Sequence, residues 1–104
     1  MRASAGLDGV RTELHGRIAA IAARPASRGQ LAREIDAIRA IAHRAGMRPA
    51  VTVAHLLDDA LSRGEHGPLV HGWLSVLSDA VACDRHDAAA CDTFAAACAV
   101  RFIG

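Results

Sequence analysis

Residues 27–61, SRGQLAREIDAIRAIAHRAGMRPAVTVAHLLDDAL, decide the fold. Apolar residues recur in this stretch at steps of three and four, which places their side chains along one face of an α-helix. The two sets are Leu31, Ile35, Ile38, Ile41 and Ala42 before Gly46, and Val53, Leu56, Leu57 and Leu61 after Pro49. The stretch therefore predicts two amphipathic helices joined by a short corner.

The ends of these two helices carry their own signals. Ser27 and Gln30 form a capping-box pattern at the start of the first helix. Gly46 is suited to end that helix, and Pro49 is suited to the first turn of the next. Because the connection is so short, we expect the two helices to be antiparallel neighbours.

The same periodicity continues toward both ends of the chain. An apolar stripe predicts a first helix, which Arg24-Pro25-Ala26 should end; it consists of Leu7, Val10, Leu14, Ile18 and Ile21. Gly67-Pro68 should open a fourth helix with Trp73 in its broad apolar arc. Asp84 should cap a fifth helix, whose inner face we expect to hold Cys91, Phe94, Ala95, Cys98 and Phe102.

No segment shows the sustained period-two alternation of a strand. The fold class that follows is all-α. We expect an antiparallel up-and-down bundle of four main helices with an additional N-terminal helix. All of residues 1–104 should form one domain, because a chain of this length has room for a single core.

Composition narrows the class of protein. Hydrophobic residues make up 52% of the chain and charged residues 22%, which excludes disorder. Lys, Asn and Tyr are absent and all 12 basic residues are Arg, a bias that indicates a GC-rich bacterial genome. Residues 1–48 have a formal charge of +5 and residues 49–104 one of −4. The basic half could attract a phosphate, a nucleic acid or an acidic protein, or the two halves could attract each other.

The three cysteines cannot all pair within the chain, and we predict a reduced, cytoplasmic protein without a signal peptide or membrane span. Cys91 and Cys98 should be buried, because they share the apolar face of the last helix. Cys83 and His86 are too few ligands for zinc, which requires three or four. We therefore expect no metal, no cofactor and no membrane partner.

Motifs of enzymes are missing. The chain has no Gly-x-Ser-x-Gly, no phosphate-binding loop and no dinucleotide-binding fingerprint. The adjacent carboxylates Asp58 and Asp59 would point about 100° apart on a helix and form a solvated surface. We do not expect an enzyme with its own pocket.

One alternative is DNA binding. Residues 42–57, AHRAGMRPAVTVAHLL, resemble the centre of a helix-turn-helix regulator at Ala42, Gly46, Met47, Thr52 and Val53. In that interpretation the helix after Pro49 would read DNA. It would present Asp58 and Asp59 outward, and these would repel phosphates. Nucleic acid is therefore the less favoured partner.

The more specific interpretation starts from His43, which the helical pattern places opposite the apolar stripe and therefore in solvent. A neutral imidazole is a good nucleophile near pH 7. Arg39 lies one turn before His43, and Arg44 and Arg48 lie just beyond it. Guanidinium groups stabilise a phosphoryl group through charged hydrogen bonds. His43 is thus a candidate phospho-acceptor, and the three arginines are candidate phosphate-binding residues.

The stretches IRAIAHRAG and VAHLLDDALSRGE resemble the histidine helix and the following helix of bacterial histidine-containing phosphotransfer (HPt) domains. The family's His-x-Leu-Lys-Gly pattern is not matched, since Arg44, Ala45, Gly46 and Met47 follow His43. The resemblance implies a non-enzymatic interaction or regulatory module of a phosphorelay, with a response-regulator receiver domain as its partner. A relative that docks receivers without carrying phosphate stays open, as do an unrelated interaction module and a homodimer.

Overall fold

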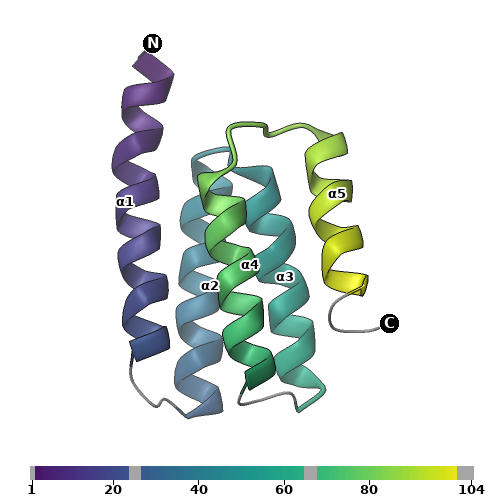
Figure 1. Cartoon of the computed structure of the whole chain (residues 1–104). Coiled ribbons are helices and arrows are strands. Elements are labelled where there is room, and N and C mark those ends of the chain that lie inside the picture. Colours follow the sequence, from purple (N-terminus) through teal and green to yellow (C-terminus); the bar gives the residue numbers. More distant parts are fainter. Residues whose placement is uncertain (1, 24–26, 65–67, 101–104) are drawn as a thin grey trace.

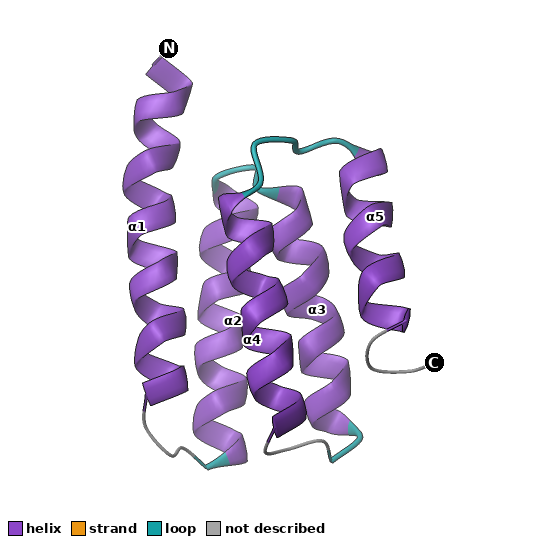
Figure 2. Cartoon of the chain, viewed as in Figure 1, coloured by secondary structure: helices purple, strands orange, loops and turns teal. Residues whose placement is uncertain are grey.

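The computed structural model describes residues 2–23, 27–64 and 68–100. These residues form five α-helices and no strand (Figure 2). The helices are α1 (Arg2–Ala23), α2 (Arg28–Arg44), α3 (Arg48–Ser62), α4 (Pro68–Ala82) and α5 (Ala88–Cys98). The expected all-α class is confirmed. Of the sequence features discussed above, Arg24-Pro25-Ala26, Gly67 and Phe102 lie outside the described residues.

Consecutive helices run in opposite directions, so the up-and-down arrangement is also confirmed (Figure 1). Helices α1 and α3 each pack against both α2 and α4, which closes a four-helix bundle. The remaining helix, α5, lies outside this bundle and packs against α3 and, less extensively, α4.

The additional helix is therefore the C-terminal one, not the N-terminal one that the sequence led us to expect. The lengths of α1 and α5, and the number of side chains that each helix buries, explain why α1 belongs to the bundle and α5 does not. Helix α1 has 22 residues and places Leu14 and Ile18 in the core, with Leu7, Val10 and Ile21 packed against it. Helix α5 has 11 residues and buries only Ala90 and Cys98.

The predicted apolar stripes supply most of the core, although Ile41 and Leu56 are only partly buried against it. Among its members on α2 and α3 are Leu31, Ile35, Ile38, Ala42, Val53, Leu57 and Leu61. Trp73 is completely buried, as predicted, whereas Leu69 on the same helix is 45% exposed. The other buried residues of α4 are Val70, Leu74, Val76, Leu77, Ala80 and Val81. Burial of this apolar surface is the main stabilising contribution to the bundle.

The corner between α2 and α3 is built by local interactions. The hydrogen bonds at the end of α2 run from the Met47 amide to the Ala42 carbonyl (2.9 Å) and from the Gly46 amide to the His43 carbonyl (3.1 Å). This is a Schellman motif, and Gly46 takes the left-handed φ of 74° that the motif requires. Pro49 lies in the first turn of α3. The predicted end of α2 and start of α3 are confirmed.

The predicted capping box is also present at the start of α2. The Ser27 hydroxyl oxygen accepts a hydrogen bond from the Gln30 amide, and the Gln30 side-chain oxygen accepts one from the Ser27 amide, both at 3.1 Å. These bonds satisfy two amides that would otherwise lack partners at the first turn.

The cap of α5 differs from the prediction, because Asp87 takes the role expected of Asp84. The Asp87 carboxylate accepts a hydrogen bond from the Ala90 amide at 2.9 Å. Asp84 instead accepts one from the Arg11 guanidinium at 3.2 Å. Arg11 also donates to the carbonyl oxygens of Val81 (3.1 Å) and Cys83 (3.3 Å), so it fastens α1 to the end of α4.

Candidate functional site

His43 is exposed in the last turn of α2, as predicted. Its position follows from the local sequence, since the buried residues Ile38 and Ala42 fix which face of α2 is turned to the core. Its imidazole has no hydrogen-bond or ion-pair partner in the described part of the chain. The ring is therefore accessible to a reacting group from outside.

Three other described histidines are less suited to react. The His15 Nε2 lies 3.1 Å from the carbonyl oxygen of Ser78, at the contact between α1 and α4. Both ring nitrogens of His86 are buried without a hydrogen-bond partner among the described residues. His55 is exposed, but its Nε2 lies 3.9 Å from the Asp59 carboxylate.

His71, like His43, is exposed and forms no ion pair with a described residue. It lies on α4, and no basic residue occurs within one helical turn of it in the sequence. His43 instead has Arg39 one turn before it and Arg44 directly after it. Both histidines are exposed, so the positive charge of neighbouring arginines is what distinguishes His43 from His71.

The three candidate phosphate-binding arginines differ in their interactions with the rest of the chain. The Arg39 side chain hydrogen-bonds to the Asp36 carboxylate through Nη2 (2.7 Å) and Nε (3.2 Å). This hydrogen bond and the Asp36 charge raise the pKa of Arg39. Arg44 and Arg48 are exposed and form no ion pair with any described residue. Arg44 and Arg48 are thus free to bind an anion, whereas Arg39 is already engaged.

Acidic residues accumulate further down the α2–α3 face, away from the corner. Partial burial raises the pKa of Asp58, and the negative charge of Asp36 on the neighbouring helix raises it further. Arg39 lowers it by a smaller amount. At the corner, by contrast, Arg44 and Arg48 have no carboxylate paired with them within the described residues.

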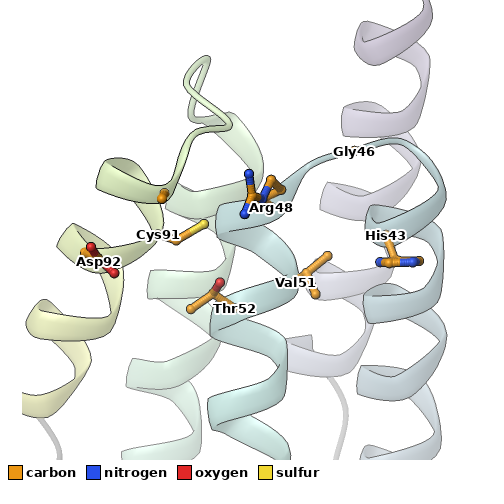
Figure 3. Close-up of a pocket in the computed structure, with 8 residues that line it drawn as sticks. His43, Gly46, Arg48, Val51, Thr52, Cys91 and Asp92 are labelled. Carbon is orange, nitrogen blue, oxygen red and sulfur yellow. The ribbon is translucent and has the colours of Figure 1, made fainter.

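His43 and Arg48 line a groove between the α2–α3 corner and α5 (Figure 3). Its volume is about 530 Å³, and the other lining residues are Gly46, Val51, Thr52, Ala88, Cys91 and Asp92. His43 lies at one end and Asp92 at the other, with Val51 and Thr52 between them. Sequence reasoning missed the contribution of α5, because that depends on where α5 packs rather than on a local pattern.

The charge along the groove is uneven. Arg48 is the first residue of α3, and Met47 before it provides no side-chain hydrogen bond to cap that helix. The unsatisfied amides of a helix start carry a partial positive charge. Positive charge thus gathers at the corner, and the Asp92 carboxylate is the negative group on the α5 side.

None of the three cysteines forms a disulfide bond in the structure described. Cys98 is buried, as predicted, but Cys91 is only half-buried, contrary to the prediction. The reason is that α5 turns Ala90 and Cys98 inward, while Cys91 borders the open groove. The described residues contain no group of three or more His, Cys, Asp or Glu side chains that could hold a metal ion.

Helix α3 is poorly placed to read DNA. It packs against α2, α4 and α5, so most of its circumference is covered. Helices α2 and α3 also lie antiparallel (Figure 1), whereas the two helices of a helix-turn-helix unit cross at about 90–120°.

Among the described residues, no helix has the length and apolar character needed to cross a membrane.

The chain has no significant match among models of protein families, curated proteins or solved structures. Any function assigned to the site therefore depends on its own residues and geometry.

Proposed function

We propose that this chain is a small protein-interaction module of the HPt-like kind, in which His43 accepts a phosphoryl group from a receiver domain. The observation that carries the proposal is the combination at the α2–α3 corner. The imidazole of His43 is exposed and has no partner among the described residues; Arg44 follows it directly in the chain, and Arg48 lines the same groove. Both arginines are exposed and form no ion pair within the described residues.

The proposed step is a transfer from a phosphorylated aspartate of the partner. The unprotonated ring nitrogen of His43 uses its electron pair to form the N–P bond. The P–O bond to the partner's aspartate breaks, and the carboxylate leaves with that electron pair. The other ring nitrogen keeps its proton. The partner supplies the magnesium ion that such a transfer uses.

The arginines have different roles in this proposal. Arg48 borders the same groove as His43, and Arg44 follows His43 directly in the chain, so these two stabilise the transferred phosphoryl group. Arg39 is held by Asp36 at 2.7 Å and contributes less. The charged hydrogen bonds replace part of the hydration that the phosphoryl group loses when the partner covers the site.

The cellular setting is part of the same proposal. Receiver domains and HPt domains belong to bacterial phosphorelays, which are signal-transduction systems of the cytoplasm. The Arg-only basic composition supports a GC-rich bacterial source, and three cysteines that form no disulfide bond in the structure described suit a reducing compartment.

Phosphoramidate tests the chemistry of His43 without a protein partner. This small donor should give the wild-type chain one phosphohistidine, detected by ³¹P NMR and located by mass spectrometry. His43→Gln should remove the signal, while the matched control His71→Gln on exposed α4 surface should keep it. Modification that persists in His43→Gln would contradict the assignment. If phosphoramidate does not phosphorylate the wild-type chain, the phosphotransfer role of His43 is wrong and the chain is an interaction module without that chemistry.

A further inference from the structure

We infer that the groove between the α2–α3 corner and α5 is the docking surface for the protein that donates the phosphoryl group, and that an acidic segment of that protein occupies it. This inference rests on the proposed function of His43. It adds α5 to the site, an element that lies more than forty residues after His43 in the chain.

The first reason is continuity. His43 itself lines the groove at one end (Figure 3). A protein that brings a phosphorus atom to the His43 ring must therefore cover at least this end of the groove. The volume of about 530 Å³ lies within the range of roughly 300–1,000 Å³ that is usual for binding pockets.

The second reason is charge complementarity. Arg48 lines the groove, and in the described part of the chain no carboxylate pairs with it. The start of α3 adds partial positive charge at the same place, because Met47 does not cap it with a side chain. Negative charge on the partner, that of its phosphorylated aspartate included, would satisfy both, so the segment that enters at the corner should be acidic.

The middle and the far end of the groove indicate which other side chains its occupant should carry. Val51, Ala88 and Cys91 provide small or apolar surface in the lining. Asp92 lies at the far end, on α5, and has no hydrogen bond or ion pair among the described residues. The occupant should therefore follow its acidic residue with a small apolar side chain, and a basic residue should face Asp92.

A matched pair of substitutions on α5 tests the inference. Ala88 and Ala89 are neighbours in the first turn of α5, and both are exposed, but only Ala88 lines the groove. A glutamate at either position suits the start of a helix, so neither variant should disturb the fold. Ala88→Glu adds bulk and negative charge to the groove, whereas Ala89→Glu adds them outside it.

The measurement is transfer of ³²P from a phosphorylated receiver domain to the full chain. Ala88→Glu should lower kcat/KM at least tenfold, mainly through KM, while Ala89→Glu should leave it within twofold of wild type. Ala88→Gln should show a smaller loss than Ala88→Glu, which separates bulk from charge. For both Ala88 variants the rate of phosphorylation by phosphoramidate should fall much less than the rate of transfer from the receiver domain, because this donor does not need a docking surface. For Ala89→Glu the rate with phosphoramidate should be unchanged.

The outcomes separate the two proposals. Equal transfer rates for Ala88→Glu and Ala89→Glu would overturn the docking surface and leave His43 as the acceptor. Phosphorylation by phosphoramidate but by no receiver domain would also overturn it. A wild-type chain that phosphoramidate cannot modify would overturn the function of His43 itself, and the docking inference with it.

Discussion

Trp73 is the largest fully buried side chain in the described part of the molecule. Its replacement by alanine empties a site that the surrounding helices cannot fill completely. We expect Trp73→Ala to lower the free energy of unfolding by about 3–5 kcal/mol, measured by urea denaturation followed by far-UV circular dichroism. Leu69→Ala on the same helix, where the side chain is 45% exposed, should cost much less. Similar losses for both variants would contradict the burial of Trp73.

The arginines near His43 allow a second test at the scale of single residues. Arg48→Gln should slow phosphorylation of His43 by phosphoramidate about tenfold, the effect of losing one charged hydrogen bond of roughly 1.5 kcal/mol. Arg39→Gln should change the rate by less than about twofold, since the Arg39 guanidinium is held 2.7 Å from Asp36. The opposite order of the two variants would show that Arg39, not Arg48, binds the phosphoryl group.

At the scale of elements, two glycines should respond to alanine with opposite signs. Gly46 ends α2 with a φ of 74°, a conformation that costs a residue with a Cβ about 1–2 kcal/mol. Gly16 lies within α1, and a Cβ there would meet nothing within 4 Å. Gly46→Ala should therefore destabilise the protein by about 1 kcal/mol, and Gly16→Ala should stabilise it by about 0.5–1 kcal/mol. The midpoint of thermal unfolding should therefore fall in Gly46→Ala and rise in Gly16→Ala. A shift of the same sign in both variants would contradict this end of α2.

Helix α5 should lose its cap in acid. The hydrogen bond from the Ala90 amide, and next the bond from Arg85, hold the pKa of Asp87 below its ordinary value. The resulting stabilisation is complete above the unfolded pKa of about 3.9 and is lost as the pH falls through the lower folded pKa. Hydrogen exchange of the Ala90 amide should accordingly speed up below about pH 4 relative to the intrinsic rate.

Asp87→Asn is the control for this effect, because asparagine caps a helix as well as aspartate does but does not titrate. The variant should keep α5 protected with a weaker dependence on pH. An identical pH profile in the wild type and in Asp87→Asn would assign the acid sensitivity of α5 to other groups.

The elements also show which features are readable from sequence. The end of α2 was predictable from Gly46 and Pro49, because a Schellman turn and a proline in a first turn are local requirements. The cap of α5 was not, since two aspartates three residues apart both fit the pattern. Arg11, distant in sequence, hydrogen-bonds to Asp84 and leaves the cap to Asp87.

At the scale of the whole molecule, apolar periodicity predicted the number and direction of the helices but not how they are grouped. The short apolar face of α5, with Ala90 and Cys98 buried, is the reason that this helix packs outside the bundle formed by α1 to α4. The exposure of His43 could be predicted from the stripe around Ile38. The groove could not, because Cys91 and Asp92 reach it only through the packing of α5 against α3.

Charge is distributed unevenly between the two halves of the chain. Residues 1–48 carry a formal charge of +5 and residues 49–104 one of −4, so α2 contributes positive charge and the later helices negative charge. Within the described residues, Arg28 and Arg33 in the first half of α2 form no ion pair, and neither do Arg44 and Arg48 at the end that holds His43. An acidic partner should approach this end faster at low ionic strength, because salt screens the attraction.

Transfer of ³²P from a phosphorylated receiver domain to the full chain tests the central claim most directly. The account predicts acid-labile label on the wild type and on His71→Gln, and no label on His43→Gln, with all three chains equally helical by circular dichroism. Label that persists on a folded His43→Gln variant would contradict the assignment of His43 as the phospho-acceptor.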